Sequence, residues 1–180
     1  MPFSTRLFTL FLVVWLPSQA LAAEVVFHDT SAEVYFSPRG GAQQALLRHI
    51  EQARKSIFVQ AYGFTSPEIA SALLAAADRG VHVEAILDRS QRKARGTKAG
   101  ALAEAGIPVY IDSRHAIAHN KVMVLDRRIV ITGSYNFTKS AETRNAENLL
   151  IVESPELARK YLSSWRKHKK HSKPWLQPSN

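Results

Sequence analysis

Five residues whose side chains suit phosphate chemistry recur at short spacings in the second half of the chain. They occur in His119-Asn120-Lys121, in Gly133-Ser134-Tyr135-Asn136 and in Glu147-Asn148. A neutral imidazole can attack phosphorus, and a carboxylate that accepts its other ring N–H fixes the tautomer and stabilises the developing cation. We therefore predict phosphoryl transfer with His119 as nucleophile and Glu147 as its orienting partner. The side chains expected to bind phosphate oxygens are Lys121, Ser134 and Asn136.

Strand periodicity indicates how these side chains meet. Residues two apart on a strand share a face, so His119 projects with Lys121, and Ser134 with Asn136. Glu147 directly precedes another apolar run. Adjacent strands are expected to bring all five side chains to one end of a sheet. Nothing in this set requires a metal or a cofactor.

Short β-like runs alternate with helical spacings along the chain. Strands are expected at 33–36, 57–61, 81–87, 109–111, 121–125, 129–132 and 149–152. Helices are expected at 42–54, 66–79, 99–105 and from 155 to about 167. Asp126-Arg127-Arg128 lies between two of the strands and predicts a tight hairpin. The pattern predicts one α/β domain over 23–180, with a mixed β-sheet flanked by helices.

The first 22 residues have the layout of a secretory signal. Arg6 precedes an apolar run over 7–16, and Ala20-Leu21-Ala22 fits an A-x-A cleavage site. The apolar run is about half of the ~20 residues that span a bilayer. We predict cleavage after Ala22 and a periplasmic or secreted product with no stable membrane insertion.

The composition favours a polyanionic partner. The formal net charge is +9, and loss of Arg6 with the signal leaves +8. Absence of cysteine excludes thiol chemistry, disulfides and cysteine-ligated metals.

A basic loop follows the strand at 81–87, where α/β folds place ligands, and is predicted to bind nucleic acid. Its basic residues are Arg89, Arg92, Lys93, Arg95 and Lys98. A second basic segment, 166–173, forms a C-terminal tail that could equally be a solvated face.

The spacing H-x-K-x-x-x-x-D, formed by His119, Lys121 and Asp126, resembles the signature of the phospholipase D superfamily. The Gly-Ser-x-Asn and Glu-Asn segments are also typical of it. The layout most resembles the small secreted bacterial endonucleases of that superfamily, over residues 33–165. The resemblance implies that Asp126 belongs with the catalytic residues. It lies an odd number of residues from His119 and at a turn, which favours a supporting role over direct catalysis.

The resemblance implies a metal-independent phosphodiesterase that cuts DNA or RNA through a phosphohistidine. A second histidine protonates the leaving oxygen and then activates water. His168 and His171 also begin H-x-K triplets, but neither has an aspartate five residues after its lysine. One motif per chain therefore implies a homodimer whose two-fold interface holds the active site.

Two other interpretations stay open, and a third is rejected. A phospholipase D or phosphatidyl-transferring enzyme would need an apolar surface for acyl chains. A basic nucleic-acid-binding protein with a vestigial site is the non-enzymatic alternative. His115 and His119 are four apart, but a zinc-protease helix needs Glu where Ala116 stands, so no metal site is predicted.

Overall fold

The computed structural model describes residues 25–27 and 30–175. The predicted signal segment, residues 1–22, lies outside the described residues. Every helix in the described ranges is too short or too polar to cross a bilayer.

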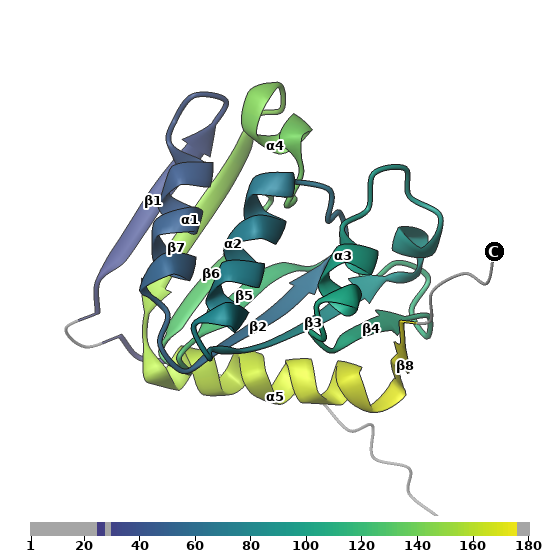
Figure 1. The fold of residues 1–180 in the computed structure, drawn as a ribbon. Helices are drawn as coiled ribbons and strands as arrows, with labels where there is room; N and C mark the ends of the chain where they lie inside the picture. The colour runs from purple at the N-terminus through teal and green to yellow at the C-terminus, as the bar shows by residue number, and fades with distance from the viewer. Residues whose placement is uncertain (1–24, 28–29, 176–180) are drawn as a thin grey trace, which may run out of the picture.

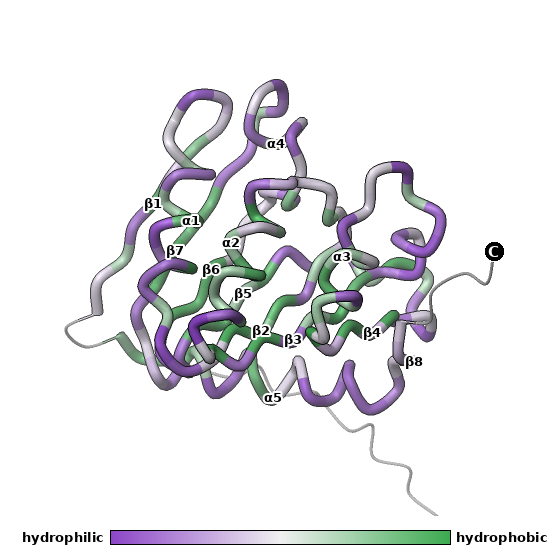
Figure 2. Tube along the Cα trace, viewed as in Figure 1, coloured by the Kyte–Doolittle hydropathy of each residue, from purple (hydrophilic) through white to green (hydrophobic). Residues whose placement is uncertain are grey.

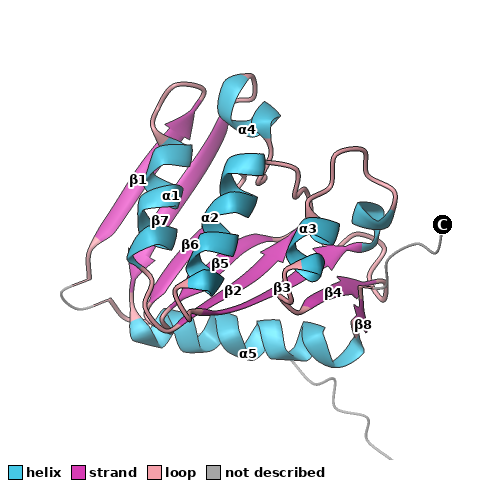
Figure 3. Ribbon diagram, in the orientation of Figure 1, coloured by secondary structure: helices cyan, strands magenta, loops and turns pink. Residues whose placement is uncertain are grey.

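One sheet of eight strands forms the framework of the described part of the chain (Figures 1 and 3). The strands lie in the order β1-β7-β6-β5-β2-β3-β4-β8. Their bounds are β1 Ala32–Ser37, β2 Ser56–Ala61, β3 His82–Asp88, β4 Val109–Asp112, β5 Lys121–Leu125, β6 Ile129–Gly133, β7 Glu147–Glu153 and β8 Lys173–Pro174. β3 is parallel to β2 and β4, and the other neighbouring pairs are antiparallel. The predicted mixed sheet is confirmed.

Helices cover both faces of this sheet (Figure 1). α1, α2 and α3 lie on one face, and the long α5 lies on the other. The helical bounds are α1 Ala42–Gln52, α2 Pro67–Asp78, the 3₁₀ turn η1 Arg89–Arg92, α3 Ala99–Glu104, α4 Lys139–Thr143 and α5 Pro155–His171. The helix expected at 66–79 is observed as α2, and Ser66 caps it because its side chain accepts the Ile69 N–H.

Because both faces are covered, the central strands are mostly apolar along their length and do not alternate apolar with polar residues. Every residue of β2 is buried, and Figure 2 shows the central strands as hydrophobic. The larger core lies between the sheet and α1 to α3, and the smaller one between the sheet and α5. Trp165 anchors α5 by donating its indole N–H to the Val59 carbonyl at 2.9 Å.

The structure differs from the sequence predictions chiefly at the C-terminus. The last helix continues to His171 instead of ending near Lys167, and β8 follows it on β4. The segment predicted as a basic tail is thus largely helical. Contacts from β3 and β4 hold it: Lys169 pairs with Glu84 at 2.5 Å, and His168 with Asp112 at 2.8 Å. The short elements η1 and α4 were also not predicted.

Candidate active site

Strand direction places the predicted residues at one edge of the sheet. β5 begins at this edge directly after His119 and Asn120, β6 ends there at Gly133, and β7 begins there at Glu147. β6 is antiparallel to both β5 and β7. Five of the six predicted catalytic residues line one open cavity of about 380 Å³ at this edge: His119, Lys121, Ser134, Asn136 and Glu147. Their catalytic roles stay predictions.

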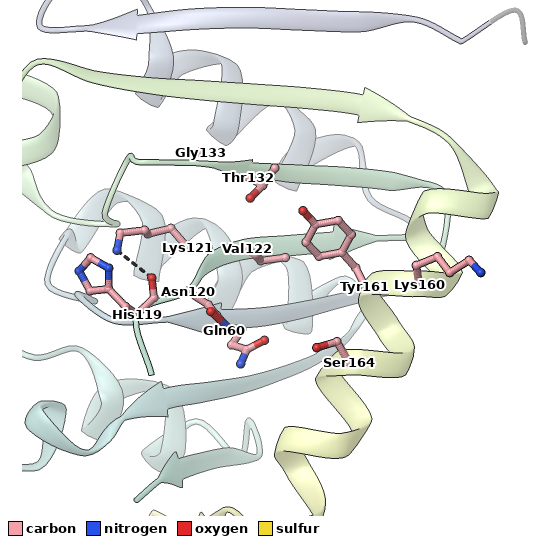
Figure 4. Close-up of a pocket in the computed structure, with 10 residues that line it drawn as sticks. All are labelled: Gln60, His119, Asn120, Lys121, Val122, Thr132, Gly133, Lys160, Tyr161 and Ser164. Carbon is pink, nitrogen blue, oxygen red and sulfur yellow. Dashed lines mark hydrogen bonds between the residues drawn. The ribbon is translucent and has the colours of Figure 1, made fainter. Parts of the chain in front are cut away.

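His119 is exposed, and its surroundings fix the ring without burying it. The Tyr62 ring meets it edge-on, with centroids 4.5 Å apart. The Tyr62 N–H donates to the Asn120 carbonyl at 2.8 Å, which joins the end of β2 to the start of β5. Lys121 is buried, and its ammonium donates to the His119 carbonyl at 2.9 Å (Figure 4). The two motif side chains therefore share one wall of the cavity.

Gly133 allows β6 to approach β7 closely at the cavity. Its φ is +149°, and a Cβ there would lie 2.3 Å from the Asn148 carbonyl oxygen. The N–H groups of Ser134 and Tyr135 donate to that same oxygen at 3.1 and 3.2 Å. A glycine is needed here because any side chain would separate the strands and displace Ser134.

The structure corrects the predicted partner of Glu147. Its carboxylate accepts the Ser134 hydroxyl at 2.5 Å and the Asn145 amide at 3.0 Å. Among the residues that the structure describes, no carboxylate contacts the His119 ring. Glu147 lines the cavity but is bonded to Ser134, directly after β6, and to Asn145, just before β7. The Glu147 carboxylate of the same chain therefore does not orient the His119 ring in this structure.

Two buried polar groups of the cavity differ in what they can bind. Burial lowers the pKa of the Lys121 ammonium, and the nearby Glu147 carboxylate opposes part of that shift. The Asn136 side-chain oxygen is buried and has no hydrogen-bond partner within the described residues. An unpaired buried carbonyl oxygen costs free energy and is satisfied only by a hydrogen-bond donor, such as water or a substrate hydroxyl, so the phosphate oxygens are left to the Lys121 ammonium.

A second cavity of about 440 Å³ adjoins His119 and Lys121 on the face covered by α5 (Figure 4). Tyr161 and Ser164 of α5 and Gln60 of β2 line it. Gln60 is buried, and its amide nitrogen has no partner among the described residues. Sequence reasoning missed Gln60, although an amide inside the apolar strand Ser56–Ala61 is a signal that could have marked it.

Asp126 is the one predicted catalytic residue that the structure places elsewhere. It follows β5 at the opposite edge, so roughly 20 Å of extended chain separates it from His119. Its carboxylate accepts the N–H groups of Arg54, Lys55 and Ser56 at 2.7–3.2 Å. Its inclusion among the catalytic residues is therefore corrected. Its position fits the supporting role.

Asp126→Asn is expected to lower stability by about 1–3 kcal/mol while activity at 25 °C is kept, because a weaker acceptor faces three N–H groups. Burial raises the pKa of Asp126, but the N–H donors of Ser56, Arg54 and Lys55 outweigh it and hold the pKa below its ordinary value. The charged form thus stabilises the fold above about pH 4, and this contribution is lost as pH falls. Thermal melting of both proteins from pH 7 to pH 3 checks this. A melting difference that grows on acidification would contradict it.

The basic loop predicted to bind nucleic acid lies at the same edge as His119. η1 follows β3, and β3 runs parallel to β2, which ends beside the start of β5. The exposed basic residues are Arg89, Lys93 and Arg95, whereas Arg92 and Lys98 are half-buried. Gln91 fixes the loop because its side-chain oxygen accepts the Phe64 N–H and the Thr97 hydroxyl.

Known proteins share both sequence and fold with this chain. Residues 46–168 match the family described as "Cardiolipin synthase, PLD-like domain". "Phospholipase D" of Rickettsia conorii is 46% identical over 159 residues, which cover 84% of this chain and 80% of that protein. Human "Mitochondrial cardiolipin hydrolase" is 32% identical over 86% of this chain and 65% of its own length.

The solved structure of Nuc, a phospholipase D family member from Salmonella typhimurium, superposes with a TM-score of 0.78. It is 39% identical, and the match covers 82% of this chain and 99% of Nuc. The fold therefore agrees with the sequence comparison. This chain belongs to the phospholipase D superfamily.

Proposed function

We propose that this phosphodiesterase cleaves nucleic acid through a phosphohistidine at His119, without a catalytic metal. One observation carries the proposal. His119, Lys121, Ser134, Asn136 and Glu147 line a single open cavity at the sheet edge that also bears the basic loop. An exposed imidazole that can attack phosphorus and a buried ammonium that can neutralise phosphate oxygens are the groups that metal-free phosphoryl transfer needs.

The reaction would proceed in two displacements. A nitrogen of His119 attacks phosphorus, the P–N bond forms as the P–O bond to the leaving strand breaks, and a second imidazolium protonates the leaving oxygen. That second imidazole then takes a proton from water, and the resulting hydroxide displaces His119 from phosphorus. In both steps the Lys121 ammonium offsets the negative charge that develops on the phosphate oxygens. It thus does what a metal cation would otherwise do.

We further propose that the second imidazole is His119 of a two-fold related subunit. The chain carries one complete motif, so a single subunit supplies one nucleophile and no acid partner for it. His119 is exposed, and Ile117, two residues before it, is 58% exposed although apolar. An exposed apolar side chain beside an open site supports an interface there. The two identical imidazoles would then titrate as a pair.

Plasmid DNA incubated with purified protein in excess EDTA tests the nuclease, with His119→Ala as the matched control. Cleavage by the wild type and none by the variant are expected. Loss of wild-type cleavage in EDTA, at a temperature where melting shows the protein to be folded, would overturn the metal-free mechanism. Cleavage by both proteins would indicate a contaminating nuclease and remove the support for His119.

The basic loop is expected to act by binding phosphates without reading bases. The triple variant Arg89→Gln, Lys93→Gln and Arg95→Gln should weaken DNA binding by a similar factor for all sequences. The slope of log Kd against log salt should fall by about 2.7, or about 0.9 for each phosphate that the loop no longer neutralises. Fluorescence anisotropy with a labelled duplex, using the His119→Ala background to prevent cleavage, measures both quantities.

A matched control removes the same charge from the opposite edge. Arg54, Lys55 and Arg127 are exposed there beside Asp126. Their triple glutamine variant should change the salt slope much less than the loop variant. Equal changes in both variants would show that net charge, and not this loop, determines binding.

A lipid phosphodiester is the second candidate substrate. The names of the relatives favour it, since one is a phospholipase D and another a cardiolipin hydrolase. The exposed side chain of Ile117 beside the cavity could contact acyl chains. Vesicles of phosphatidylcholine with or without cardiolipin, assayed for phosphatidic acid beside the DNA assay, separate the two. Lipid cleavage without DNA cleavage would replace the nuclease proposal.

A further inference from the structure

Four potential metal ligands that the proposed reaction does not use converge at the end of β4. They are Asp112, His115, His168 and His171, and their ligand atoms all lie within 4.8 Å of one another. Asp112 closes β4, His115 lies in the following loop, and the other two belong to the last turns of α5. We propose that this cluster binds one divalent transition metal ion, with Zn²⁺ as the best match, and that the ion is structural.

The spacing of the donor atoms suits a tetrahedral ion. The Asp112 Oδ2 lies 3.0 Å from His115 Nδ1, 2.8 Å from His168 Nδ1 and 3.2 Å from His171 Nε2. Zinc binds nitrogen and carboxylate oxygen at about 2.0–2.1 Å, so ligand atoms in a tetrahedral site lie about 3.3 Å apart. The carboxylate–imidazole distances are therefore already near those of a zinc site. Three imidazoles and one carboxylate form a closed four-ligand set, as structural zinc sites have.

Hydrogen bonding alone accounts poorly for this arrangement. Three imidazole nitrogens converge on the single Oδ2, whereas Oδ1 accepts the backbone N–H of Arg114 at 3.0 Å. A carboxylate oxygen offers two lone-pair sites, so three donors on one oxygen exceed its capacity. The three rings also crowd together, with centroids 4.8–5.4 Å apart. A cation bound by neutral imidazoles would use all four groups without a surplus donor.

The cluster is both anchored and accessible. Asp112 is fully buried, whereas the side chains of His115, His168 and His171 are 45%, 20% and 19% exposed. The three imidazoles line an open cavity of about 480 Å³, which provides an entry path. Arg114, Lys167 and Lys170 also line it, so the surroundings do not attract a cation at long range. Affinity must come from coordination, which favours a transition metal over Mg²⁺ or Ca²⁺.

An ion here would join three parts of the chain that lead to the active site. It would tie the end of α5 to β4 and to the loop that runs from residue 113 to His119. The other end of that loop is already fixed, because the Ala118 N–H donates to the buried Asp88 at 2.7 Å. The site thus lies four residues from the nucleophile but supplies no group to the cavity that contains it. Metal binding would stabilise the fold and leave phosphoryl transfer metal-free.

Zinc titration of untagged, EDTA-treated and dialysed protein tests the proposal, with melting temperature and calorimetry as readouts. One ion per chain is expected. At a free zinc concentration of about 100 times Kd, the melting temperature should rise by about 5–10 °C. Co²⁺ should give the visible absorption of a tetrahedral site. Zinc that neither binds nor raises the melting temperature of the wild type would overturn the proposal.

Variants locate the ion. His168→Gln, and separately the more exposed His115→Gln, should lower zinc affinity at least tenfold and reduce the shift at the same zinc concentration to about half or less. The matched control is His82→Gln, because His82 also pairs with a carboxylate, Glu84, at 2.7 Å but lies outside the cluster. His119→Asn must keep the shift, which excludes binding at the catalytic imidazole. A shift that stays undiminished in both cluster variants would contradict the assignment without bearing on the nuclease. A shift that disappears in His119→Asn would place the ion at the catalytic imidazole and would contradict both this assignment and the metal-free mechanism.

Discussion

Replacement of His119 by alanine is expected to lower kcat for phosphodiester cleavage by about 10⁴-fold or more, with the fold intact. The loss is large because His119 is the one imidazole among the described residues that line this cavity, so the variant keeps groups that bind the phosphate but loses the proposed nucleophile. Stability should change little, since His119 is exposed and its ring contacts chiefly that of Tyr62. The measurement is single-turnover cleavage of a labelled oligonucleotide, with thermal melting to verify folding.

The covalent step gives the same variant a second readout. Wild-type reactions quenched in alkali should carry phosphate or a nucleotide on the peptide that contains His119, and His119→Ala should carry none. His82→Gln is the matched control, because it removes another exposed imidazole that lies outside the cavity. Unlabelled wild-type protein during steady turnover, or cleavage by His119→Ala near the wild-type rate, would refute covalent catalysis at this residue.

Most of the fold could be predicted from short stretches of sequence, because each central helix or strand has its own apolar spacing, cap or turn residues. Ser66 and Pro67 mark the start of α2, and the turn at Asp126 and Arg127, both with positive φ, closes the predicted hairpin. The end of α5 carries no such signal. Its apolar spacing stops at Trp165, and the last turns are held by Asp112 and Glu84, which are far away in the chain. Long-range polar contacts of this kind leave no periodic trace in a sequence.

The candidate site likewise has features that the sequence predicted and features that it could not predict. Spacing and strand direction brought His119, Lys121 and Asn136 to one cavity, because these follow from the period of a strand and the order of the sheet. The bonds of Glu147 could not be predicted, since several hydroxyls and amides compete for one carboxylate at close range. The histidine cluster was missed for a related reason. Its ligands come from two segments more than 50 residues apart, so no short metal-binding motif exists.

An excess of the inactive His119→Ala subunit is expected to suppress the wild type if two subunits share one active site. After subunit exchange with a tenfold excess of the variant, about one wild-type subunit in eleven has a wild-type partner, so activity should fall to about one-tenth. The reason is that a mixed pair holds one imidazole, which cannot be both nucleophile and acid. Independent sites in each subunit would leave activity unchanged at any excess.

The time course separates this effect from competition for DNA. Immediately after mixing, before subunits exchange, the variant only competes for substrate, and saturating DNA removes that competition. Loss of activity should then develop at the rate of subunit exchange, which fluorescence energy transfer between labelled subunits measures independently. Suppression that is complete at once, or a wild-type protein that sediments as a monomer while fully active, would contradict a shared site. In that case a single His119 would have to serve both displacements, with water or another side chain as the acid.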